Sequence, residues 1–123
     1  KERMTYVVYQ LQLVQGKAYF GTTPFWRKDQ RLSEHRDGGG AKWTARFPPV
    51  ENDPIVQTWH FPTRRAAYDF EEQVVKDYLL VHGLDSARGG MCNYGDVGGY
   101  NMWVPRSLRN LVPLEYNWNQ NDP

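Results

Sequence analysis

The chain has 123 residues and a formal net charge of +1, and its one cysteine, Cys92, excludes an intrachain disulfide. No apolar run approaches the roughly 20 residues that a membrane-spanning helix needs, and no charged and then apolar leader opens the sequence. We therefore expect no membrane partner and a reducing, cytoplasmic location, or a nuclear or viral one if the source is a eukaryotic virus. A chain of this length suits one compact domain, so we predict a single domain over 1–123, with a core over about 5–90 and a loop-rich extension over 91–123.

A β-hairpin is predicted near the N-terminus, from alternating apolar residues over 5–13 and a second β-prone run over 18–22. A three-residue loop with Gly16 at positive φ would place Tyr9 and Tyr19 on the same side of the sheet. A two-residue loop would separate them, because a slip of one residue inverts the facing of a strand. The sequence permits either register.

A first helix is expected to begin somewhere within 23–28, with Thr23 as its cap, and to end before the glycines at 38–40. Arg31 and His35 are four residues apart in this helix and therefore share one of its faces.

A third strand over 55–61 precedes the clearest helix, which Thr63 caps and which ends near His82, before Gly83. Its predicted apolar stripe consists of Ala67, Phe70, Val74, Val75 and Tyr78. Glu71 lies in the middle of this stripe, where a carboxylate is costly unless it is paired, protonated or bound to a cation. Either Glu71 pairs with an arginine or a tyrosine and joins the helix to the sheet, or it is a metal ligand or a catalytic group.

Cations and tryptophans interleave between the hairpin and the third strand. The residues concerned are Trp26, Arg27, Lys28, Arg31, Arg36, Lys42, Trp43 and Arg46. Such a pattern suits phosphate and base contacts, and it equally suits a solvated helix followed by a loop. The net charge of +1 is weak evidence for nucleic-acid binding.

In their order along the chain, these segments resemble the GIY-YIG endonuclease family. The two half-motifs are Val7-Val8-Tyr9 and Tyr19-Phe20-Gly21, with nine residues between them. Arg31 and His35 resemble the R-x-x-x-H helix of the family, and Glu71 stands where its metal-binding glutamate belongs.

Two further segments resemble one branch of small bacterial and viral members of that family. Lys42-Trp43-Thr44 resembles a K-W-T stretch, and residues 83–90 resemble a G-x-x-N-V-R-G-G segment. Within the latter, Ser86 stands where the branch carries an asparagine, and Asn101 is a candidate substitute.

The resemblance implies an α/β domain with a small, mainly antiparallel three-stranded sheet flanked by helices. It implies a metal-dependent endonuclease that hydrolyses DNA, with Tyr9 as general base, Arg31 on the phosphate, and Glu71 holding Mg²⁺ or Mn²⁺. Tyr19 and His35 would orient water or the phosphate. To act as a base near neutral pH, Tyr9 would need nearby positive charge to lower its pKa from the usual value near 10.

The residues expected to contact DNA are Lys17, Arg27, Lys28, Lys42, Trp43 and Arg88. Sequence specificity would require a homodimer, a partner in a larger complex, or a further segment. The alternatives are a catalytically inactive nucleic-acid-binding module of the same fold, and a protein-interaction domain.

Overall fold

A mixed sheet forms the centre of the molecule in the computed structural model, which describes residues 4–90, 92, 97 and 102–121. Its strand order is β3-β1-β2-β4, with β1 antiparallel to both neighbours and β4 parallel to β2. The strands are β1 (Tyr6–Gln12), β2 (Ala18–Pro24), β3 (Ile55–Phe61) and β4 (Ala87–Arg88). The predicted class is confirmed. The fourth strand was not predicted, because two residues are too few to show an alternating pattern.

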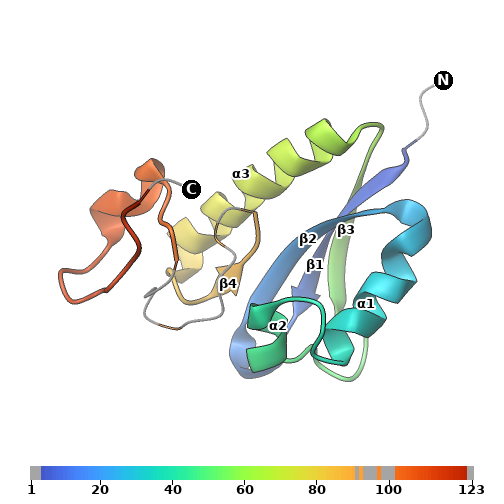
Figure 1. The fold of residues 1–123 in the computed structure, drawn as a ribbon, viewed down its shortest axis with the longest axis horizontal. Helices are drawn as coiled ribbons and strands as arrows, with labels where there is room; N and C mark the ends of the chain where they lie inside the picture. The colour runs from blue at the N-terminus through green and yellow to red at the C-terminus, as the bar shows by residue number, and fades with distance from the viewer. Residues whose placement is uncertain (1–3, 91, 93–96, 98–101, 122–123) are drawn as a thin grey trace.

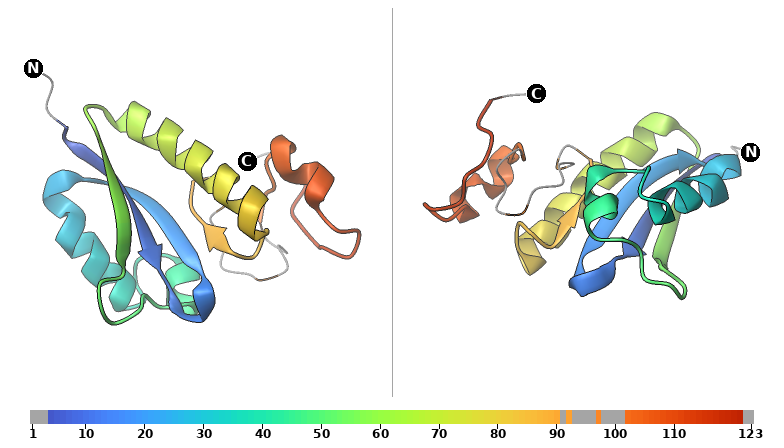
Figure 2. Two further views of the ribbon diagram at one scale, coloured as in Figure 1. Left: turned by 180° about the vertical axis from the view of Figure 1, so that it is seen from behind. Right: turned by 60° about the horizontal axis from the view of Figure 1, so that its bottom comes forward.

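Helices cover both faces of the sheet (Figure 1 and Figure 2). α1 and α2 lie against one face and α3 against the other. The helices are α1 (Lys28–Arg36), α2 (Lys42–Arg46) and α3 (Arg64–His82), with 3₁₀ turns η1 (Val14–Gly16), η2 (Phe25–Arg27) and η4 (Arg106–Leu111). Within the described residues, every helix is too short or too polar to cross a bilayer.

The hairpin has the register in which both tyrosines project from the same side. Leu11 pairs with Tyr19, and Tyr9 pairs with Gly21. The loop is the three-residue one, in which Gly16 has a φ of 71°. The alternative with a two-residue loop is therefore wrong.

α1 begins within the predicted range, but its expected cap is wrong. Thr23 lies in β2, where it is 2% exposed and pairs with Val7, so it cannot cap the helix. The chain continues as η2, and α1 begins at Lys28 without a side-chain cap. Pairing within the sheet outweighs the local capping preference of threonine.

α3 is capped as predicted, since the Thr63 hydroxyl accepts a hydrogen bond from the amide of Ala66 at 3.1 Å and Gly83 ends the helix with a φ of 98°. Its buried positions are Ala67, Glu71, Val75 and Leu79. The buried stripe therefore runs at strict four-residue spacing, and the predicted members Phe70, Val74 and Tyr78 lie half-buried at its margin. Glu71 is on the buried face, as predicted.

Candidate active site

Tyr9 and Tyr19 form the centre of a cluster on the face of the sheet that α1 covers. Their ring centroids lie 6.4 Å apart, and both side chains are buried. A β-carbon at Gly21, the residue that pairs with Tyr9, would collide with the Tyr9 hydroxyl. The glycine of the second half-motif therefore makes room for the phenol.

His35 links this cluster to α2. Its Nε2 lies 2.8 Å from the Tyr9 hydroxyl and its Nδ1 lies 2.9 Å from the Thr44 hydroxyl. The Thr44 hydroxyl donates its own hydrogen to the carbonyl of Ala41 at 3.2 Å, so it accepts from Nδ1. Nδ1 therefore carries the proton, and in the neutral ring Nε2 accepts the hydrogen bond that Tyr9 donates.

Burial, assisted by the charge of Arg31, lowers the pKa of His35 to about 4. The imidazole is therefore neutral near pH 7, with an unprotonated nitrogen facing the Tyr9 hydroxyl.

Arg31 lies beside both tyrosines and is held from the other side. Its guanidinium donates to Glu34 at 2.9 Å and to the carbonyl of Gly40 at 2.9 Å. Its positive charge lowers the pKa of Tyr9 and of Tyr19. Arg31 does not pair with Glu71, so an arginine pairing of this kind, one form of the structural explanation for a buried Glu71, is not formed.

Despite the nearby Arg31, the protein's own groups keep both tyrosine hydroxyls protonated. Burial is the largest influence on both, and it raises the pKa of Tyr19 to about 12 and that of Tyr9 further. Arg31 alone therefore does not lower the pKa of Tyr9 below its usual range, because loss of solvation outweighs the neighbouring charge. The further lowering that a bound metal would have to supply stays a prediction.

Glu71 reaches β2 from the opposite face of the sheet. Its side chain is 7% exposed and lines a small hollow with Tyr68, Glu72 and Gly90. One carboxylate oxygen accepts from the Thr22 hydroxyl at 2.5 Å, and the other accepts from the amide of Gly90. Burial raises the pKa of Glu71 even though these hydrogen bonds lower it.

Glu71 is electrostatically coupled to the tyrosine cluster, because its negative charge raises the pKa of both Tyr9 and Tyr19. The two halves of the site lie on opposite faces of β2, where Thr22, which donates to Glu71, directly follows Gly21, the partner of Tyr9 in the sheet. The glutamate lines the hollow rather than being enclosed by the core.

A divalent cation fits the surroundings of Glu71. Among the described residues, its two hydrogen-bond donors are a hydroxyl and an amide, neither of which compensates a buried negative charge. Each carboxylate oxygen accepts one hydrogen bond and retains a lone pair. No group of three or more His, Cys, Asp or Glu residues in the described ranges could hold a metal, so water and substrate oxygens would complete the coordination.

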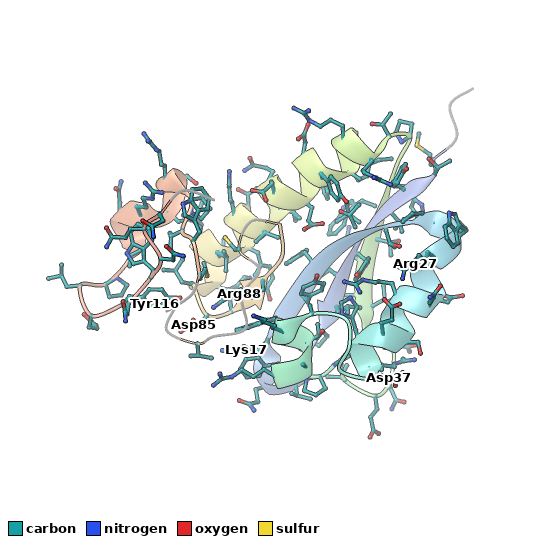
Figure 3. All side chains as sticks on the ribbon, in the orientation of Figure 1. Lys17, Arg27, Asp37, Asp85, Arg88 and Tyr116 are labelled. Atoms are coloured by element: carbon teal, nitrogen blue, oxygen red, sulfur yellow. The ribbon has the colours of Figure 1, made fainter. Side chains whose placement is uncertain are left out.

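Two residues expected to contact DNA are fully buried. The guanidinium of Arg88, which Figure 3 labels, lies 4.1 Å from the centre of the Trp43 ring. Both residues are 0% exposed. The expectation of direct DNA contacts by Trp43 and Arg88 is therefore wrong, because their surfaces cover one another inside the protein.

The other expected DNA contacts lie nearer the surface. Lys17 donates to the carbonyl of Asp85 at 2.7 Å, and Arg27 pairs with Glu34 at 2.9 Å. Lys28 is half-buried and Lys42 is exposed.

Sequence reasoning missed Thr22, Thr44 and Gly90, the partners of Glu71 and His35. Thr22 directly follows the second half-motif, and the other two belong to the segments that resemble the small branch of the family, so their positions carried the signal. Ser86 donates to the carbonyl of Gly83 at 2.6 Å and is not a partner of the site. Asn101 lies outside the described residues.

The stability of the protein should fall as the pH drops through the acidic range, because His35 is buried in its neutral form. In the unfolded chain its pKa is near 6.5, against about 4 in the fold. The neutral ring thus contributes fully above about pH 6.5, and about 3 kcal/mol is lost as the pH falls to 4. Urea unfolding of wild type and His35→Gln at several pH values measures this. An identical pH slope for the two proteins would contradict the assignment.

Gly40→Ala should destabilise the protein, because a β-carbon there would collide with Nδ1 of His35. We expect a cost of about 1–3 kcal/mol for this overpacking. Gly39→Ala is the matched control, since a β-carbon at Gly39 meets nothing within 4 Å. Equal urea midpoints for the two variants would show that the His35 pocket tolerates the extra atom.

The fold and the site thus define a small α+β domain with a buried cluster of tyrosine, histidine and arginine beside a buried glutamate. A UPF0213 protein of Halalkalibacterium halodurans is 35% identical to this chain over 71 residues, a match that covers 58% of this chain and 70% of the relative. The chain belongs to the UPF0213 family. No family model matches the sequence, and no solved structure matches the chain.

Proposed function

We propose that this protein is a GIY-YIG-type endonuclease that hydrolyses DNA phosphodiester bonds with a divalent metal ion, Mg²⁺ or Mn²⁺. The observation that carries the proposal is the environment of the Tyr9 hydroxyl. It lies beside the Arg31 guanidinium and 2.8 Å from the unprotonated Nε2 of His35. A phenol that only packs a core needs neither a cation nor a buried base.

His35 gives Tyr9 a way to act as a base although its pKa is raised. As a water molecule attacks phosphorus, its proton passes to the Tyr9 oxygen while the Tyr9 proton passes to Nε2 of His35. The P–O ester bond breaks, and the departing oxygen takes a proton from solvent. Nδ1 of His35 keeps its hydrogen bond to Thr44 throughout, which stabilises the imidazolium that forms.

Arg31 is the candidate phosphate ligand. Its bonds to Glu34 and to the Gly40 carbonyl fix the plane of the guanidinium. The guanidinium also hydrogen-bonds the hydroxyls of Tyr9 and Tyr19. The side chain is 24% exposed, so a phosphate oxygen can reach it as negative charge accumulates there.

Glu71 is the candidate metal ligand, held in place by Thr22 and Gly90. A bound divalent ion would neutralise charge on the phosphate and on the departing oxygen. The remaining candidates for contacts with the DNA backbone are Lys17, Arg27, Lys28 and Lys42.

A panel of labelled single-stranded, duplex and branched DNA, each with Mg²⁺, Mn²⁺ or a chelator, tests the proposal. We expect metal-dependent cleavage products from at least one DNA structure. Salt-sensitive retardation without products on every member would overturn the nuclease proposal in favour of a binding module. If the protein gives no cleavage products and shows no salt-sensitive DNA binding, the result would favour a protein-interaction domain.

A further inference from the structure

Arg88 is the most completely buried cation that the site described above does not use. Its guanidinium stacks on Trp43 at 4.1 Å and donates to the carbonyls of Leu84 at 2.6 Å and Ala87 at 2.8 Å. It also pairs with Asp85 at 3.3 Å. A buried charge with this number of partners is expensive to build, which indicates a specific role.

The stacked side chains of Arg88 and Trp43 join β4 to β2, the strand that carries Tyr19. Arg88 pairs with Tyr19 in the parallel ladder between β4 and β2. The Trp43 indole donates to the carbonyl of Ala18 at 3.0 Å, so both halves of the stack are anchored to the same end of β2.

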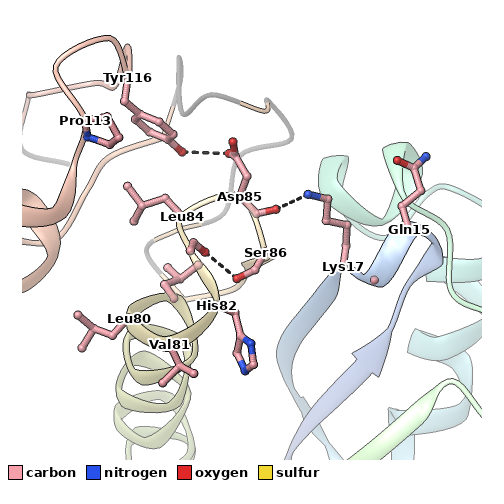
Figure 4. Close-up of a pocket in the computed structure, with 13 residues that line it drawn as sticks. Gln15, Lys17, Leu80, Val81, His82, Leu84, Asp85, Ser86, Pro113 and Tyr116 are labelled. Atoms are coloured by element: carbon pink, nitrogen blue, oxygen red, sulfur yellow. Dashed lines mark hydrogen bonds between the residues drawn. The ribbon is translucent and has the colours of Figure 1, made fainter.

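Asp85, three residues before Arg88, fixes the segment that leads into β4 (Figure 4). Its carboxylate accepts from the Tyr116 hydroxyl at 3.0 Å, and its carbonyl accepts from Lys17 at 2.7 Å. The segment that leads into Arg88 is therefore fixed from the hairpin and from the C-terminal part of the chain.

Two glycines connect this anchor to Glu71. Gly89 packs so closely that a β-carbon would lie 2.6 Å from the carbonyl oxygen of Phe20. Gly90 follows with a φ of 53° and donates its amide hydrogen to the Glu71 carboxylate. With Arg88 fixed, there is little freedom left in the position of this amide.

We infer that Arg88, stacked on Trp43, is a positioning residue that sets the Gly90 amide against Glu71 and so fixes the orientation of the carboxylate. An arginine suits this task because its planar guanidinium stacks on the indole and donates to several acceptors in its plane, which a lysine cannot do. The effect on cleavage rests on the proposed function, whereas the effect on the amide does not.

The experiment follows the Gly90 amide proton in ¹⁵N-labelled protein. We expect a downfield resonance in the wild type, because the amide donates to a carboxylate, and an upfield shift in Glu71→Gln that assigns the interaction. Arg88→Lys should move the resonance toward the Glu71→Gln position and speed its hydrogen exchange. Asp85→Asn, a milder change, should move it in the same direction by less and covers the case in which Arg88→Lys fails to fold.

Arg109→Lys is the matched control, because Arg109 also stacks on tryptophans, at 5.4 Å from Trp103 and 5.2 Å from Trp118, but in the C-terminal segment. It should leave the Gly90 resonance unchanged. An unchanged Gly90 resonance in folded Arg88→Lys would overturn the inference, even if the wild type cleaves DNA. If Arg88→Lys does not fold, an unchanged resonance in Asp85→Asn would do the same. If cleavage is present, kcat should fall about tenfold in Arg88→Lys with KM for DNA unchanged.

Discussion

Glu71→Gln should remove metal-dependent DNA cleavage and leave the protein at least as stable as the wild type. The amide is isosteric, and its oxygen can still accept from the Gly90 amide. It cannot hold a divalent cation as a carboxylate does, and loss of several kcal/mol of charge stabilisation corresponds to a rate loss on the order of 10³-fold or more. Stability should be kept or gained, because burial already disfavours the ionised form of Glu71.

Three measurements separate this outcome from simple unfolding. Thermal unfolding without metal should give a Tm at or above that of the wild type. Millimolar Mn²⁺ should raise the Tm of the wild type and not that of Glu71→Gln, since a ligand stabilises only the state that binds it. Asp77→Asn, an exposed position on the same helix, should match the wild type in both assays. Cleavage at the wild-type rate by Glu71→Gln would end the metal-ligand assignment.

Elements with a strong local pattern could be predicted from the sequence. The apolar residues of the predicted α3 stripe placed Glu71 on a buried face, and the threonine cap and the glycine stop fixed the ends of the helix. The hairpin remained open between two registers, because loop length alone decides which side a strand shows. The structure selects the register that brings Tyr9 and Tyr19 together.

The sequence did not allow us to predict which charged side chains are buried. A tryptophan interleaved with cations and an arginine beside two glycines look the same in the sequence whether they contact DNA or one another. Arg88 and Trp43 meet only because β4 runs parallel to β2, a pairing between segments about 70 residues apart. For the same reason, the only sequence signal of Thr22 and Gly90 was their place beside or within the family-like segments, and the fold was needed to show that both bond to Glu71.

The protonation states of the site likewise depend on packing. The resemblance to a nuclease family suggested Tyr9 as a base and a nearby cation to lower its pKa. The cation is present as Arg31, but burial outweighs it, and we propose the neutral His35 as the group that accepts the proton of Tyr9. His35 is neutral because α2 and the sheet enclose it, which no spacing within α1 reveals.

Tyr9→Phe should lower the cleavage rate by about 10²–10⁴-fold, the usual contribution of a positioned acid or base. The phenyl ring keeps its place beside Tyr19, and only the hydroxyl next to Arg31 and His35 is lost. Because Nε2 of His35 then has no donor among its described partners, the variant should also lose about 1–3 kcal/mol of stability. Tyr6→Phe, on the same strand, is the matched control and should cleave normally.

The pH dependence of the wild-type rate shows how Tyr9 works. If the proton passes on to His35, the rate should change little between about pH 6 and pH 8, since the imidazole is neutral throughout this range. If Tyr9 acted instead as a free phenolate, the rate would rise about tenfold for each pH unit over the same interval, because its pKa lies well above that range. A steep rise that Tyr9→Phe abolishes would assign the base to Tyr9 alone. Full activity in Tyr9→Phe would remove the hydroxyl from the reaction altogether, and with it the contact on which the proposed nuclease activity depends.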